Sequence, residues 1–185
     1  MTKIKLCGIR RPEDVAMVNR AQPDYAGFIF APGRRQVTAE QAGNPAIAAV
    51  GVFVKAPVEE AAALANRGTI QLIQLHGEED EAYVKALRER TTAPIIRVIR
   101  VRGPESLRDL DRYDCDYFLL DTYSGSQFGG LGKTFDHSLL RQARFPRPFF
   151  LAGGLDADNV AAAGWIPAAA SKLPERKMKT KSALL

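Results

Sequence analysis

A thiol and a carboxylate stand at the ends of two predicted strands and together could transfer protons. Cys7 follows the alternating run of residues 3–6 and precedes Gly8, and Asp121 ends a second, apolar run. A thiol that is partly ionised near neutral pH can act as a base, and a buried acid that keeps its proton can act as an acid. Moving a proton along a carbon skeleton, as sugar isomerisation does, needs such a pair and no cofactor.

Both residues also have an ordinary structural interpretation. A cysteine such as Cys7 can be a small buried hydrophobic residue, and its position leaves this alternative open. Asp121 could cap a helix or a loop. Burying a carboxylate at the end of an apolar strand costs free energy, so the position of Asp121 favours a functional role.

Further strand ends carry groups that could bind an anionic substrate. Arg34 and Arg35 could hold a planar carboxylate through paired hydrogen bonds, or could form a solvated basic loop. Gly153 and Gly154 could let backbone N–H groups approach a phosphate, or could form a tight turn. His76 is interpreted as a polar group at the same rim, with a satisfied core histidine as the alternative.

Other motifs indicate no metal or nucleotide. Lys133 follows a glycine-rich run, but the spacing is not that of a P-loop. No Cys/His spacing suggests a zinc site, so no metal ligands are predicted. His137 and Cys115 are interpreted as structural residues.

Seven strand candidates position these groups, and amphipathic helix candidates fill the gaps between them. The helix candidates include one that opens at Pro12, one over residues 58–66 and one over residues 79–88. Seven such units predict an α/β fold: either a (β/α)8 barrel that lacks its last unit or a doubly wound open sheet. The absence of a G-x-G-x-x-G turn disfavours a dinucleotide-binding sheet. The strand candidates are residues 3–7, 25–30, 47–54, 70–75, 94–101, 116–121 and 148–152.

Composition bounds the remaining possibilities. The 185 residues suit one domain with its own core. No apolar run is long enough to span a bilayer, and the N-terminus leads straight into a strand with no visible signal peptide. Two cysteines make no disulfide framework, which favours a reducing, cytoplasmic location.

The net charge of +5 gives little support to a nucleic-acid partner. Residues 172–185 carry five basic side chains and one acidic one, so most of the charge belongs to the tail. That tail has no aromatic residue to stack on bases. Neither a nucleic acid nor a membrane is therefore an expected partner.

Seven short motifs occur in a fixed order over about residues 3–160. In this order they resemble the phosphoribosylanthranilate isomerase family, whose members are (β/α)8 enzymes of tryptophan biosynthesis. The motifs are Lys5-Leu6-Cys7-Gly8, Gly27-Phe28-Ile29-Phe30-Ala31-Pro32, Gly51-Val52-Phe53-Val54, Gln74-Leu75-His76-Gly77, Leu120-Asp121-Thr122, Gly129-Gly130-Leu131-Gly132-Lys133-Thr134-Phe135-Asp136 and Leu151-Ala152-Gly153-Gly154-Leu155.

The resemblance implies an Amadori rearrangement of N-(5-phosphoribosyl)anthranilate to 1-(2-carboxyphenylamino)-1-deoxyribulose 5-phosphate, without a cofactor. Asp121 matches the general acid that opens the ribose ring, and Cys7 matches the base that removes the C2 proton. Arg35 matches the arginine that holds the anthranilate carboxylate. Gly153 and Gly154 match half of the phosphate site. The implied partner is a phosphorylated small molecule, and the chain would be a monomer or a homodimer.

The sequence departs from the family pattern in two loops. The loop after the second strand is one residue shorter than usual, and Leu131 stands where a small polar residue is usual. Two other functions remain as alternatives. A histidine-pathway sugar-phosphate isomerase is disfavoured, because its strand-1 base is expected to be an aspartate rather than Cys7. A non-catalytic remnant of the tryptophan-pathway enzyme is the second alternative.

The last 25 residues do not follow the family pattern. We expect a barrel domain over residues 1–160 and a basic, irregular tail over residues 161–185, with no β-rich run in the tail. Read in a shifted frame, the codons of residues 163–185 allow the string G-V-D-x-S-S-G-V-E-T-x-G-K-K-D, which is similar to the family's strand 8 and phosphate loop. The tail therefore predicts a frameshift, by gene lesion or sequencing error, which the coding DNA would decide.

The predicted loss of the last unit bears on activity. Strand 8 closes such a barrel against strand 1, and its loop carries the other half of the phosphate site. Binding of a remote phosphate helps to position the reacting atoms. We therefore expect little or no activity from the chain as written.

Overall fold

The computed structural model describes residues 3–42, 45–123 and 135–155. The chain divides into two compact units between Ile96 and Arg97, within the strand β5 (Ile95–Val101). The tail of residues 161–185, the glycine-rich motif with Leu131 and Lys133, and the predicted frameshift lie outside the described residues.

The first unit, Lys3–Ile96, is built on parallel strands that follow one another in chain order. In their shared register, Cys7 pairs with Gly27. The Ile73 amide donates to the Pro94 carbonyl, which leads into β5. The strands are β1 (Lys5–Cys7), β2 (Tyr25–Ile29), β3 (Ala48–Phe53) and β4 (Leu72–Leu75).

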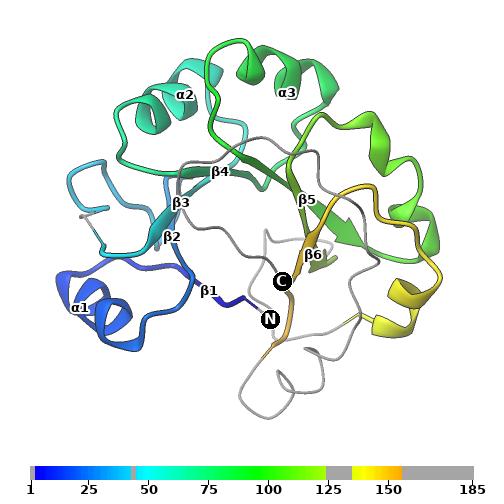
Figure 1. The fold of residues 1–185 in the computed structure, drawn as a ribbon, viewed down its shortest axis with the longest axis horizontal. Helices are drawn as coiled ribbons and strands as arrows, with labels where there is room; N and C mark the ends of the chain where they lie inside the picture. Colours follow the sequence, from blue (N-terminus) through cyan, green and yellow to red (C-terminus); the bar gives the residue numbers. More distant parts are fainter. Residues whose placement is uncertain (1–2, 43–44, 124–134, 156–185) are drawn as a thin grey trace. The chain divides into compact units, whose positions relative to one another are not determined.

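Three helices lie along the outer side of these strands: α1 (Pro12–Ala21), α2 (Val58–Asn66) and α3 (Glu81–Arg88) (Figure 1). Pro12 in the first turn suits α1, because that position has no intrahelical N–H bond to lose. The Asp80 side chain accepts the Tyr83 amide at 2.8 Å and so begins α3. Helices α2 and α3 pack side by side.

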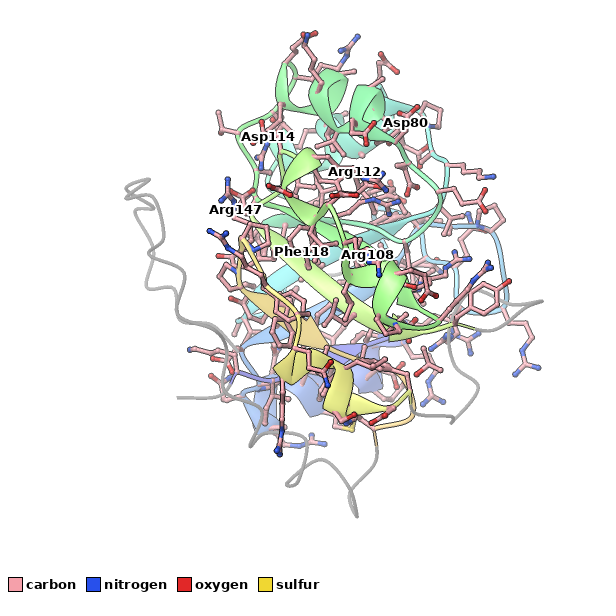
Figure 2. The ribbon with its side chains drawn as sticks, turned by 90° about the vertical axis from the view of Figure 1, so that its right-hand side faces the viewer. Asp80, Arg108, Arg112, Asp114, Phe118 and Arg147 are labelled. Carbon is pink, nitrogen blue, oxygen red and sulfur yellow. The ribbon has the colours of Figure 1, made fainter. Side chains whose placement is uncertain are left out.

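The second unit contains the rest of β5 together with β6 (Tyr117–Thr122) and β7 (Phe149–Leu151), and β6 and β7 pair in parallel. Figure 2 labels Phe118, a fully buried residue of β6, and Arg147, which precedes β7. The Arg147 side chain donates to the Cys115 carbonyl at 3.2 Å. This bond ties the segment that enters β7 to the one that enters β6.

In three of the gaps the described residues contain no α-helix, although a helix was expected in every gap. In the described part of residues 30–47 the chain makes turns and one bridge rather than a helix. Between β5 and β6 it forms the 3-10 helices η1 (Pro104–Leu107) and η2 (Leu110–Arg112), and before β7 it forms η3 (His137–Arg141). Asp109, between η1 and η2, has a left-handed backbone that interrupts helical geometry.

All seven predicted strands are confirmed, with bounds that differ from the prediction by at most two residues. Their order runs from β1 to β7 without reversal. A doubly wound sheet reverses its strand order at a switch point, so this order is that of a (β/α)8 barrel. The barrel is incomplete in the described residues, which hold no eighth strand. No helix of that part of the chain is both long and apolar enough to cross a membrane.

Candidate active site

Cys7 stands exposed at the carboxyl end of β1, as a free thiol. The interpretation of Cys7 as a buried hydrophobic residue is therefore wrong. The next residue, Gly8, has a φ of +92°, which turns the chain away from the strand. The amides of Gly8 and Ile9 both donate to the Gly27 carbonyl, at 2.9 and 3.1 Å. These bonds fix the backbone directly after the thiol.

Gly27 leaves room for the thiol on the neighbouring strand. A Cβ atom built on Gly27 would lie 2.7 Å from the Cys7 Sγ and 3.1 Å from the Cys7 Cα. The first of these distances is shorter than real Cβ contacts, so a side chain on Gly27 would force the Cys7 thiol to move. The Cys7 side chain thus packs against bare backbone of β2, and glycine at this position lets the thiol keep its place.

The Arg35 side chain lies against Gly8. Its Nη1 atom is 2.9 Å from the place that a Cβ of Gly8 would occupy. Arg35 therefore brings a permanent positive charge next to the residue that follows the thiol. A pocket of about 520 Å³ opens here, lined by Gly8, Arg10, Arg11, Asp14, Arg34 and Arg35. With four arginines and one aspartate, this pocket suits an anionic group.

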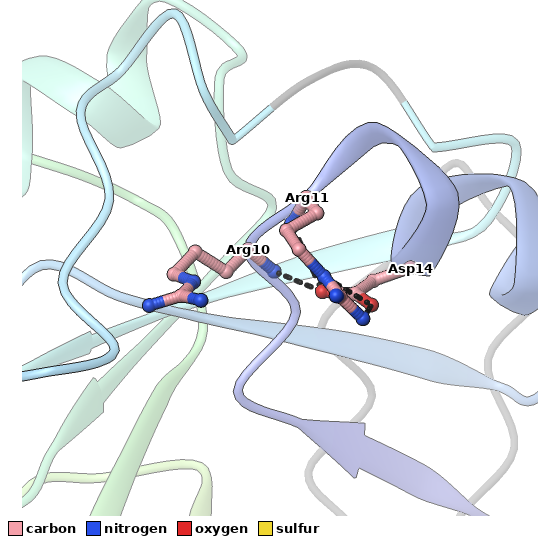
Figure 3. Close-up of polar contacts among 3 residues, drawn as sticks. All are labelled: Arg10, Arg11 and Asp14. Atoms are coloured by element: carbon pink, nitrogen blue, oxygen red, sulfur yellow. Dashed lines mark hydrogen bonds and ion pairs between the residues drawn. The ribbon is translucent and has the colours of Figure 1, made fainter.

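The residues at the start of α1, Arg10, Arg11 and Asp14, line the pocket, and Figure 3 shows their contacts. One Asp14 oxygen accepts the backbone amides of Arg10 and Arg11, at 3.2 and 2.9 Å. The other oxygen pairs with the Arg11 guanidinium at 2.9 Å. The side-chain bond from Arg11, followed by the backbone bonds, lowers the pKa of Asp14 from 3.8 to about 2. The Arg11 guanidinium is thus paired with Asp14 at the start of the helix.

We expect the Asp14 carboxylate to stabilise the fold at neutral pH and to stop doing so in acid. Because its pKa is lower in the folded chain, the stabilisation is present above about pH 4 and is lost as the pH falls toward 2. Asp14→Asn should lower the Tm at pH 7 and leave it near that of the parent chain at about pH 2. Glu13→Gln, which removes a charge from the same turn, is the control. Equal effects of the two variants at pH 7 would contradict the prediction.

His76 lies half-buried at the carboxyl end of β4. Its amide donates to the Phe53 carbonyl at 2.8 Å, and its Nδ1 lies 2.8 Å from the side-chain nitrogen of buried Gln74. Gln74 therefore orients the imidazole ring. Both the rim interpretation and the satisfied histidine fit these contacts, and a substrate contact by His76 stays a prediction.

Asp121 is the buried acid of the second unit, with 6% of its surface exposed. It is the penultimate residue of β6, and its Oδ1 accepts the amide of Thr122 at 2.9 Å. This bond orients the carboxylate at the carboxyl end of the strand. The position matches the prediction that Asp121 ends a buried strand, apart from one further residue, Thr122.

The chain bends at the two glycines after β7 and there approaches Asp121. Gly153 and Gly154 have φ values of +87° and +65°, which glycine adopts at little cost. A Cβ built on Gly153 would lie 2.7 Å from the Thr122 nitrogen and 2.9 Å from the Asp121 Oδ1. The bend at these two residues fits the tight-turn interpretation. Phosphate binding by this turn remains a prediction.

Gly153→Ala is expected to destabilise the chain more than a glycine replacement in open space. Gly68 is the matched control, because its φ is +77° and a Cβ there would meet nothing within 4 Å. Alanine at Gly68 should cost about 1 kcal/mol through backbone strain alone. At Gly153 crowding against Thr122 should add a further 1–3 kcal/mol or so. Urea unfolding measures both, and equal costs would contradict the crowding.

These site residues belong to a chain with well-defined relatives. A family model described as N-(5'-phosphoribosyl)anthranilate (PRA) isomerase matches residues 4–169. This chain belongs to the PRA isomerase family. The predicted resemblance and the isomerase function of tryptophan biosynthesis are thus confirmed, which decides against the histidine-pathway alternative. The match continues nine residues past the predicted end of the family pattern at residue 160.

Individual PRA isomerases are similar over most of their length. The protein from Endomicrobium trichonymphae is 44% identical over 169 residues, which cover 88% of this chain and 82% of that protein. The crystal structure of the Thermotoga maritima enzyme is 31% identical, with a TM-score of 0.74, and the match covers 90% of this chain and 83% of that one.

A further solved PRA isomerase is in complex with reduced 1-(o-carboxyphenylamino)-1-deoxyribulose 5-phosphate. It is 30% identical, with a TM-score of 0.69, and the match covers 88% of this chain and 81% of that one.

Sequence reasoning about this PRA isomerase missed two residues of the site. Gly27 is inside a motif, but its role appears only from its register with Cys7. Arg10 was not singled out, although it is charged and follows the Cys7-Gly8-Ile9 run. Within the described ranges no three His, Cys, Asp or Glu side chains gather as a metal site would require.

Proposed function

We propose that this chain isomerises N-(5-phosphoribosyl)anthranilate with Cys7 as the general base and Asp121 as the general acid. Asp121 gives a proton to the ribose ring oxygen as the C1–O bond breaks, which leaves a Schiff base between C1 and the anthranilate nitrogen. Cys7 then removes the proton from C2, and the resulting enol-amine tautomerises to the 2-ketone. Substrate and product have the same atoms, so the reaction consumes no co-reactant.

The observation that carries the proposal is the exposed thiol of Cys7 at a strand end, with the Arg35 side chain lying against the next residue, Gly8. A base of this kind must reach a carbon-bound proton, and Cys7 is exposed at a strand end, on backbone fixed by two hydrogen bonds. Arg35 lies against the next residue, Gly8, where it could hold the anthranilate carboxylate. A carboxylate held here would place the substrate close to the base.

The second unit supplies the acid and a phosphate contact in this proposal. Asp121 is buried at the carboxyl end of β6, where its carboxyl group would act as the proton donor. The left-handed turn of Gly153 and Gly154 presents backbone without side chains, as an approach to phosphate requires. The free thiols of Cys7 and Cys115 fit a reducing compartment, and we place the protein in the cytoplasm.

The proposal is tested by giving the purified chain freshly made N-(5-phosphoribosyl)anthranilate, with enzyme in excess so that slow turnover is resolved. In line with the low activity expected from the sequence, 1-(2-carboxyphenylamino)-1-deoxyribulose 5-phosphate should form slowly but above the uncatalysed rate, with EDTA present. Calorimetric titration with the reduced product analogue measures binding in parallel. Binding without turnover would identify the chain as a catalytically impaired remnant. A folded chain that neither binds nor converts would refute the proposal.

A further inference from the structure

Arg10 makes a side-chain contact with the loop that carries Arg35. Its Nη1 donates to the Arg34 carbonyl oxygen at 2.7 Å, across 24 positions of sequence. The donor is charged, and charge-assisted hydrogen bonds are stronger than neutral ones. The bond therefore holds the peptide that joins Arg34 to Arg35.

The loop is fixed on both sides of this peptide by other contacts. The Gln36 amide donates to the Gly33 carbonyl at 3.1 Å, and its side chain donates to the Phe30 carbonyl at 3.0 Å. The Val37 amide donates to the Ile29 carbonyl at 2.8 Å. At the tip of the loop, Gly33 has a φ of +151° and a Cβ built on it would meet nothing within 4 Å, so this residue adds no packing contact there. In the described part of the chain, the hydrogen bond from the Arg10 side chain to the Arg34 carbonyl holds this tip.

The neighbouring Arg11 does not make this hydrogen bond to the Arg34 carbonyl, because its guanidinium pairs with another residue. Arg11 is paired with Asp14, and the same carboxylate accepts the backbone amide of Arg10. Figure 3 shows the Arg10 side chain pointing away from Arg11 and Asp14. Asp14 thus anchors the Arg10 backbone at the helix start, while the guanidinium reaches in the opposite direction.

We infer that Arg10 is a positioning residue, which holds the Arg34 peptide so that the Arg35 guanidinium stays over Gly8 and is ready for the substrate carboxylate. The inference rests on the proposed role of Arg35. Arg10 acts through the loop, so its loss weakens carboxylate binding by leaving Arg35 less ordered, and does not remove a substrate contact of its own.

Two measurements test this role. Hydrogen exchange of the peptide covering residues 31–37 should rise about fivefold in Arg10→Met, because the tip loses its tie. Titration with reduced 1-(o-carboxyphenylamino)-1-deoxyribulose 5-phosphate should give a Kd about tenfold higher. Arg10→Lys should recover part of both effects, since lysine keeps one charged donor. Arg20→Met, which removes an exposed arginine at the far end of α1, should change neither.

A double-mutant cycle with Arg35→Met separates positioning from direct contact. If Arg10 acts through Arg35, Arg10→Met should change the Kd less than about twofold once Arg35 is methionine. Additive effects, or unchanged hydrogen exchange in Arg10→Met, would overturn the inference and leave the proposed function standing. A normal Kd in Arg35→Met alone would instead remove the proposed carboxylate role, and the inference with it.

Discussion

Cys7→Ser is expected to lower turnover by about 10²–10⁴-fold, the usual contribution of a general base. Serine keeps the size of the side chain, but its hydroxyl is far less acidic than a thiol and stays protonated near neutral pH. Binding of the reduced product analogue should persist, because Arg35 and the glycine turn are unchanged. Single-turnover conversion with enzyme in excess measures the loss.

The second cysteine of the chain is the control for Cys7. Cys115 is 2% exposed and follows no strand end, so Cys115→Ser should change stability rather than the chemical step. Iodoacetamide offers a measurement that does not depend on turnover, because it should alkylate exposed Cys7 and spare Cys115 in the folded chain. Turnover of Cys7→Ser within about threefold of the parent chain would exclude Cys7 as the base.

Asp121→Asn should cause a loss of the same order, about 10²–10⁴-fold in turnover. Asparagine is nearly isosteric, and its carbonyl oxygen can still accept the Thr122 amide that Asp121 now accepts. The fold around β6 should therefore survive while the proton donor is lost. Unchanged thermal unfolding together with lost turnover is the expected result.

An aspartate elsewhere in the same unit controls for the loss of charge. Asp136 is exposed and caps η3 by accepting the Ser138 amide at 2.9 Å. Asp136→Asn should leave turnover within about twofold of the parent chain. If Asp121→Asn were as active as Asp136→Asn, ring opening would need a different acid.

Most of the scaffold could be predicted because parallel strands buried on both faces give continuous apolar runs. Helix α2 was predicted over its observed residues, and α1 begins at Pro12 as expected. The prediction of α-helices where 3-10 helices form failed for a physical reason. Short segments such as Pro104–Leu107 contain helix-compatible residues, but too few to complete an α-helix before the backbone changes direction.

The site could be predicted only in part. Each predicted residue of this group ends or follows a strand: Cys7, Asp121, Arg35 and His76. The carboxyl ends of parallel strands lie at the same edge of the sheet, so the topology alone predicts where these residues lie. The fold of Arg35 back over Gly8 depends on loop geometry that no periodicity encodes. The contact of Arg10 could not be predicted either, because its partner is a backbone carbonyl oxygen, which every residue type has.

The glycine beside the thiol limits how this enzyme could change. Gly27 takes no part in proton transfer, yet any side chain there would displace the Cys7 Sγ from its place on β1. Mutations that abolish activity can thus arise at a position with no functional group, and a screen restricted to polar residues would overlook it. Redesign of the base, for example to a longer carboxylate, would have to respect the empty space that Gly27 keeps for the smaller thiol.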